Sequence, residues 1–243
     1  MVDNGFIFGD QATWDFPICK VEKYPEIPTP VKRYQTYTVP GRSGDLHVFE
    51  GAFDNVTKSY ACYFHADEFV SETAHEVKQW LLANQGYQRL IDMYDQEHYY
   101  RASILSEIKI ENWMNKYARF TVNFSCDPRA FLISGDNPLT LDASGTMLRN
   151  PCAFPAQPLI TVYGTGDGSL TVGGVTVELF GLDGEILLDC EDMEAYRLVA
   201  GVMVSRNKNI SAPEFPVLQP GPNEITWTGG VEQVEIIPRW WTL

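Results

Sequence analysis

Glycine-rich turns break residues 159–190 into strand-length pieces, and this spacing restricts the fold more than any other feature of the sequence. Runs rich in Val, Ile, Leu and Thr are separated by residues 164–168, by the pair Gly173-Gly174 and by Asp183-Gly184. Short turns of this kind join neighbouring antiparallel strands. We expect three hairpins here, with no room for a helix between them. The second half of the chain is therefore predicted to be an antiparallel β-sandwich.

One helix is predicted in the first half, over residues 71–85. Thr73 and Glu76 have the spacing of a capping box, and Gly86 is placed where a left-handed residue ends a helix. Strand-like runs surround the helix, and residues 117–126 alternate best between apolar and polar. We therefore expect a β-sandwich with one helix packed on it. The apolar stripe of this helix, at helical spacing, is Ala74, Val77, Trp80 and Leu81.

A stretch without clear periodicity separates the two halves. Turn residues precede Pro138, and three further X-Pro pairs follow before residue 159. Frequent prolines and turn residues are typical of a crossing between domains. We therefore predict a mainly β protein of two β-sandwich-like domains. Residues 1–137 would hold the helix and a protruding hairpin, and residues 138–243 would form the second domain.

Residues 34–49 have the clearest turn chemistry of the first half. Pro40 presets the backbone of the first corner of a type II turn, and Gly41 supplies the positive φ that the second corner needs. The flanking runs are rich in Thr, Tyr, Val and Phe, which favour strands. The prediction is a protruding β-hairpin, for which an ordinary surface hairpin is the plain alternative. Its expected contact residues are Tyr37, Val39, Pro40, Gly41, Arg42, Gly44, Asp45 and Leu46.

The charge balance excludes several functional classes. The formal net charge is -14, whereas binding to a nucleic acid backbone needs clustered Lys and Arg. No apolar run approaches the roughly 20 residues that span a bilayer, and the N-terminus lacks the basic and apolar regions of an export signal. We expect a soluble protein made in the cytoplasm, without membrane insertion, metal or cofactor.

The cysteines lack zinc-site or disulfide spacing and are expected to be buried thiols: Cys19, Cys62, Cys126, Cys152 and Cys190.

Two groups of side chains could carry chemistry. The first group is an acidic cluster at a strand end. A pair of carboxylates can act in a glycosidase, and several carboxylate oxygens can bind calcium. The interpretation that we favour is a solvated acidic loop. That cluster is Asp189, Glu191, Asp192 and Glu194. Exposed tryptophans could stack on sugars, whereas buried ones would belong to the core. The candidates are Trp227, Trp240 and Trp241.

Several short motifs, in their order and spacing, resemble the distal tail protein (Dit) family of phages with siphovirus-type tails. The resemblance spans nearly the whole chain. The motifs are residues 6–9 (FIFG), 39–46 (VPGRSGDL), 158–168 (PLITVYGTGDG), 215–225 (FPVLQPGPNEI) and the stretch from 227–229 (WTG) to 237–239 (IPR).

The resemblance implies a structural protein of the virion tail tip, synthesised in the host cytoplasm. It implies a homohexameric ring that joins the tail tube to the host-adhesion device, with the hairpin reaching onto the neighbouring subunit. The second domain would be similar to a galectin or a carbohydrate-binding module. Implied partners are the tail tube protein, the tail-tip hub or tail-associated protein and a receptor-binding protein, with host-surface carbohydrate as a further candidate. The family has no known catalytic residues, so the expectation is no enzyme.

Two alternatives stay open from the residues themselves. The first is a lectin-like β-sandwich module that aids attachment to the host surface, and the second is a β-sandwich hydrolase. The sequence also leaves open whether its last strand closes the second domain or returns to the first.

Overall fold

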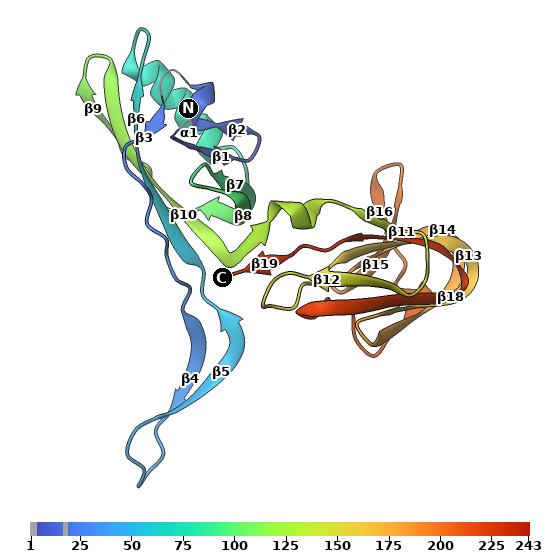
Figure 1. Cartoon of the computed structure of the whole chain (residues 1–243). Coiled ribbons are helices and arrows are strands. Elements are labelled where there is room, and N and C mark those ends of the chain that lie inside the picture. The colour runs from blue at the N-terminus through green and yellow to red at the C-terminus, as the bar shows by residue number, and fades with distance from the viewer. Residues whose placement is uncertain (1–3, 17–18) are drawn as a thin grey trace. The chain divides into compact units, whose positions relative to one another are not determined.

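The computed structural model describes residues 4–16 and 19–243, most of which lie in strands (Figure 1). In this part of the chain the strands form sheets of nine, eight and two strands. Contacts group the chain into two compact units, Met1–Ala130 with Leu243 and Phe131–Thr242. The expected mainly β fold with one helix is confirmed. The expected domain border after residue 137 stays a prediction and lies just beyond the division between these units.

The first unit is built on the nine-stranded sheet, in which β10 is paired with β6, β8, β9 and β19 (Trp241–Thr242). The strand order along the main path of the sheet is β2-β1-β7-β8-β10-β6-β3. The elements are β1 (Phe6–Phe8), β2 (Gln11–Ala12), the 3-10 helix η1 (Thr13–Asp15), β3 (Lys20–Val21), β6 (Val56–His65), α1 (Val70–Leu82), β7 (Gln88–Asp92), β8 (Asp95–Ile104), β9 (Ile110–Met114) and β10 (Tyr117–Leu132).

Alternation along β6 and β10 builds the core of this unit, and for β10 the sequence predicts it. Every second side chain of β6 is buried, and β10 buries the matching set on the same face. Helix α1 adds its apolar stripe, and the Trp80 indole N–H donates a hydrogen bond to the Phe8 carbonyl at 3.0 Å. The ring of Trp80 also stacks on Phe16, with ring centroids 4.9 Å apart. The helix is therefore fixed to the sheet by both packing and a buried hydrogen bond.

One ion pair is buried inside this core. The Lys58 ammonium lies 3.6 Å from the Asp92 carboxylate and 4.0 Å from the centre of the Tyr100 ring. The Tyr60 hydroxyl donates a hydrogen bond to the same carboxylate at 2.8 Å. Burial, with the charge of Asp92 added to it, raises the pKa of Tyr60, so the phenol stays protonated and can donate this bond. The group is a satisfied polar network within the core.

The ends of α1 differ from the prediction. The helix begins at Val70 after Phe69, which has no side-chain cap, while Thr73 is buried inside the helix. The predicted capping box is therefore wrong. The helix ends at Leu82, and Gly86 has a φ of 76° but lies beyond the cap residue Ala83, so it is not the residue that ends the helix. Packing of the apolar stripe decides these ends, because it outweighs a single capping bond.

The second unit is built on the eight-stranded sheet, with strand order β11-β18-β13-β14-β15-β16. Its apolar residues form one continuous core that includes Trp240. Its elements are η2 (Ile133–Asp136), β11 (Leu139–Leu141), β12 (Thr146–Asn150), β13 (Leu159–Val172), β14 (Val175–Asp189), β15 (Glu194–Val199), β16 (Val202–Ser205), η3 (Asn207–Asn209), β17 (Ile210–Ser211), β18 (Gly221–Ile237) and β19 (Trp241–Thr242).

The three predicted hairpins between residues 159 and 190 are one hairpin. Gly173-Gly174 joins β13 to β14, and both strands run on through the other glycines. Gly164 lies opposite Gly184 in this pair, and the register shifts between Gly166 and Gly168. The glycines therefore mark a β-bulge within long strands and not turns between short ones.

Close backbone contact explains why glycine is needed at this bulge. A Cβ atom on Gly164 would lie 2.1 Å from the Gly230 carbonyl oxygen, and one on Gly230 would lie 1.7 Å from the Thr165 carbonyl oxygen. Strands β13 and β18 therefore approach too closely here for any side chain. Strand β18 also passes through Gly229-Gly230 without a break.

We expect Gly230→Ala to lower the free energy of unfolding by about 3 kcal/mol, because backbone must move to admit the methyl group. The matched control is Gly174→Ala, where a Cβ meets no atom within 4 Å but the φ of 90° is strained. That strain costs about 1 kcal/mol. Urea unfolding of both variants measures the difference, and an equal loss in the two would contradict close approach as the cause.

Candidate subunit interface

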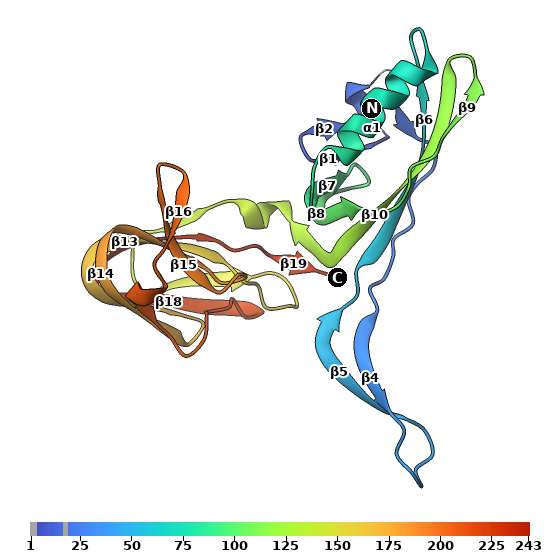
Figure 2. The same cartoon turned by 180° about the vertical axis from the view of Figure 1, so that it is seen from behind.

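The predicted hairpin over residues 34–49 is confirmed and forms the feature that we call the arm. It consists of β4 (Lys32–Tyr37), β5 (Leu46–Phe53) and the tip between them (Figures 1 and 2). Within the described residues, these two strands pair only with each other. Tyr37 and Leu46 end the paired strands opposite one another, and the other predicted contact residues lie in the tip: Val39, Pro40, Gly41, Arg42, Gly44 and Asp45.

The tip has the backbone that its sequence predicts. The Arg42 N–H donates a hydrogen bond to the Val39 carbonyl at 3.1 Å, and Gly41 between them has a φ of 79°. The Thr38 hydroxyl donates to the Asp45 carboxylate at 3.0 Å across the base of the tip. The Arg42 guanidinium, in contrast, makes no ion pair or hydrogen bond with the described part of the chain. The tip therefore presents one unpaired positive charge.

Apolar side chains are exposed on both faces of the arm. One face has the Tyr34 and Phe49 rings, whose centroids lie 5.7 Å apart, and the other has Tyr37, Leu46 and Val48. An isolated two-stranded hairpin is marginally stable in water, and exposed apolar patches mark contact surfaces. These exposed apolar side chains therefore mark the arm as a candidate contact surface. Its large apolar side chains, each between 39% and 49% exposed, are Tyr34, Tyr37, Val39, Leu46, Val48 and Phe49.

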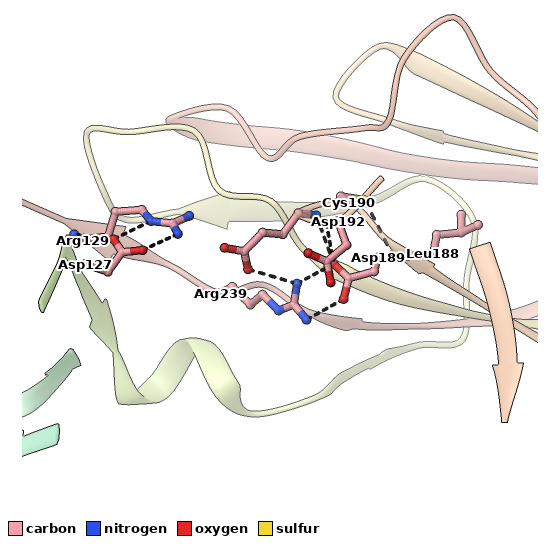
Figure 3. Close-up of polar contacts among 8 residues, drawn as sticks. Asp127, Arg129, Leu188, Asp189, Cys190, Asp192 and Arg239 are labelled. Carbon is pink, nitrogen blue, oxygen red and sulfur yellow. Dashed lines mark hydrogen bonds and ion pairs between the residues drawn. The ribbon is translucent and has the colours of Figure 1, made fainter. Parts of the chain in front are cut away.

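The acidic cluster is not a solvated loop at its centre, which corrects the sequence interpretation (Figure 3). Asp189 is buried, and its two carboxylate oxygens accept hydrogen bonds from the Arg239 guanidinium at 2.8 and 3.0 Å. The backbone N–H groups of Glu191 and Asp192 donate to the same carboxylate. Figure 3 also shows a second such pair, Asp127 with Arg129, in which the guanidinium contacts both carboxylate oxygens.

The ion pair controls the titration of Asp189. Burial by itself raises the pKa of this carboxyl, but the hydrogen bonds and the charge of Arg239 outweigh burial and hold the pKa below the usual range of an aspartate. The carboxylate is therefore charged and fully bonded at neutral pH. A group held in this way joins the end of β14 to the segment between β18 and β19 and has no free oxygen for proton transfer.

We expect the second unit to lose stability in acid through this pair. The folded pKa of Asp189 lies below the unfolded value of about 3.9, so the pair contributes fully above that value and its contribution is lost as the pH falls through the folded pKa. Urea unfolding between pH 7 and pH 2 measures the loss. Asp189→Asn should be less stable at pH 7 and should flatten the profile below pH 4, and an unchanged slope would contradict this role.

The tryptophans of the second unit pack and do not form an exposed platform. Trp240 is buried, and Trp227 is half-buried against the same core. Trp241 stacks on Phe154 with centroids 4.6 Å apart, and its indole N–H donates to the Pro155 carbonyl at 2.9 Å. Of the two roles that the sequence leaves open for these tryptophans, the structure supports packing and not stacking on sugars.

Two further observations concern residues 4–16 and 19–243. No group of three or more His, Cys, Asp and Glu side chains is placed there to hold a metal ion. None of the helices in these ranges combines the length and the apolar character that crossing a membrane requires.

Sequence reasoning missed a second exposed hairpin, formed by β15 and β16. Its turn, Ala200-Gly201, has φ angles of 51° and 80°. The sequence does contain a signal for this hairpin, because residues 198–204 have no polar side chain and include the turn residue Gly201. The exposed large apolar residues of this hairpin are Leu198, Val199, Val202, Met203 and Val204.

Comparison with known proteins gives matches at the level of structure. No protein-family model matches the sequence, and no curated protein sequence matches it. The Dit protein of phage SPP1, described as a paradigm of the hub adsorption apparatus in phages that infect Gram-positive bacteria, superposes with a TM-score of 0.72. The two are 13% identical, and the match covers 98% of this chain and 99% of that chain.

Two structures of the phage p2 baseplate in its activated conformation also match. The structure with Sr has a TM-score of 0.54 at 7% identity, covering 95% of this chain and 97% of that chain. The structure with Ca has a TM-score of 0.51 at 8% identity, covering 97% and 98%. Coverage of nearly the whole chain means that both units and their order are shared. The chain has the fold of the phage Dit proteins that its sequence resembles.

Proposed function

We propose that this protein is a structural component of a phage tail tip and has no enzymatic activity. In this proposal six copies form a ring that joins the tail tube to the host-adhesion device. The arm is the observation that carries it, since a ribbon with apolar side chains on both faces needs a second chain to cover it. The fold likeness to a Dit protein described as part of a hub adsorption apparatus supports the location.

A closed ring is the assembly that suits such an arm. A hairpin that contacts a different surface on the next copy makes a head-to-tail interface, and such interfaces either close into rings or extend without limit. Closure covers every arm and leaves none free to aggregate. The proposed partners are further copies of the chain, the tail tube protein, the tail-tip hub or tail-associated protein and a receptor-binding protein.

Native mass spectrometry combined with negative-stain imaging tests the proposal. The expected result is a particle of six times 27.5 kDa with a central opening. A lectin-like module would instead give a monomer or dimer that glycan surfaces retain. A protein that stays monomeric at high concentration, also in the presence of the tail tube protein, would contradict the ring.

A further inference from the structure

The first unit has a concave surface to which the proposed function assigns no role. Two adjoining depressions of about 370 and 400 Å³ share Glu22 and Arg119 as lining residues. They lie along strands β6, β9 and β10, on the face of the sheet opposite the core. We call this surface the cleft, and its main residues are Glu22, Glu107, Glu111, Trp113, Tyr117 and Arg119.

The cleft has one negative charge in excess. The Arg119 guanidinium lies 2.8 Å from the Glu22 carboxylate, and Arg119 is also directly opposite Glu111 in the β9–β10 pair. Lys109 is paired with Glu107 at 3.6 Å. Glu111 makes no ion pair or hydrogen bond of its own among the described residues. An exposed carboxylate is thus available on the rim of the cleft.

Two exposed aromatic side chains, Trp113 and Tyr117, form an aromatic wall of the cleft beside this carboxylate. The Arg119 guanidinium lies 4.1 Å from the centre of the Trp113 ring, and the centre of the Tyr117 ring lies 4.6 Å from that of the His65 ring. Trp113 is 58% exposed and Tyr117 is 43% exposed. Trp, Tyr and Arg are the residue types that dominate binding energy at protein interfaces. Here they are already ordered by these ring contacts.

We propose that the cleft receives the arm tip of a neighbouring copy, with Arg42 facing Glu111 and with Val39 and Pro40 against Trp113. The inference rests on the proposed ring and names the surface to which the arm binds. The tip presents one unpaired cation and exposed apolar residues, and the cleft presents one unpaired anion and an exposed aromatic wall. A head-to-tail ring needs two different surfaces on each copy, and the first unit offers both.

The arm is long enough to reach another copy. Strand β5 has eight residues and so extends about 27 Å, before the tip is added. Gly41 and Gly44 have no side chains, which keeps the tip narrow where it would enter the cleft. Contacts made at the tip are also the most distant from the arm's own unit.

Engineered cysteines test this contact directly. Arg42→Cys and Glu111→Cys are placed in one chain with Cys152→Ser, which removes the only native cysteine that is not buried. Burial raises the pKa of Cys19, Cys126 and Cys190 to about 12, so these thiols stay unreactive. Mild oxidation should give a ladder of covalent species up to six chains, whereas a mixture of the two single variants should give covalent dimers. Arg42→Cys with Glu72→Cys, an exposed glutamate of α1, is the control and should give neither.

The outcomes separate this inference from the ring itself. A hexamer that forms no disulfide between the two engineered positions overturns the docking surface and leaves the ring intact, while a protein with no hexamer overturns both.

If the cysteines disturb assembly, charge exchange gives a second measurement. Arg42→Glu should raise the concentration for half assembly at least about tenfold, and adding Glu111→Arg should restore it. Failure of the second change to rescue the first would contradict the contact.

Discussion

Replacement of residues 38–45 by Asn-Gly should abolish the hexamer and leave the subunit folded. Tyr37 lies opposite Leu46, so a two-residue turn between them closes the hairpin in its present register. The removed residues are all exposed and contribute nothing to the core of the first unit. Every interface of the ring loses its tip contact at once, and weakening of all interfaces together dissociates the ring.

Native mass spectrometry measures assembly of this variant, and calorimetry measures the stability of its subunit. The expected result is a monomer whose unfolding temperature matches that of the parent subunit. The matched control replaces Ala200-Gly201 by Asn-Gly, which changes the two-residue turn of the other exposed hairpin. That control should still form rings, and intact rings from the shortened arm would reduce the arm to an ordinary surface hairpin.

Replacement of Arg239 by Met should lower the free energy of unfolding of the second unit by about 3 kcal/mol. Asp189 has a side chain only 9% exposed, and loss of the guanidinium leaves its charge buried without a counter-charge. Urea unfolding, followed by hydrogen exchange in β13 and β14, measures the effect in the unit that holds the pair.

Two further variants make this prediction specific. Asp189→Asn combined with Arg239→Met removes both charges and should recover a large part of the loss, because no buried charge then remains unpaired. Arg197→Ala breaks the pair with Asp183, whose side chain is 95% exposed, and should change stability by less than about 1 kcal/mol. Equal losses for Arg239→Met and Arg197→Ala would contradict the role of burial.

Local patterns predicted the local structure well. The apolar stripe of α1 and the alternation of β6 and β10 lie where the sequence indicates, because burial of a periodic face depends only on neighbouring residues. The turn of the arm was equally readable, since Pro40 and Gly41 fix the backbone by themselves. These parts of the fold required no knowledge of distant contacts.

The glycines of the second unit were misread for the opposite reason. A glycine in a turn and a glycine in a β-bulge look alike in sequence, and only the approach of Gly230 to Thr165 distinguishes them. Asp189 similarly depends on Arg239, 50 residues further along the chain. The cleft was missed because Glu22, Glu111 and Arg119 come from three separate segments. Pairings at long range are what single-sequence patterns leave undetermined.

The order of strands in the second sheet has a consequence for biosynthesis. Strand β18 pairs with β11, β12 and β13, yet it is translated after all strands from β11 to β17. Strands β13 and β14 must therefore stay soluble in the growing chain until β18, the strand beside β13, is made. The first unit can fold earlier. Translation that stops before β18 would yield a chain with a complete arm and an open, aggregation-prone sheet behind it.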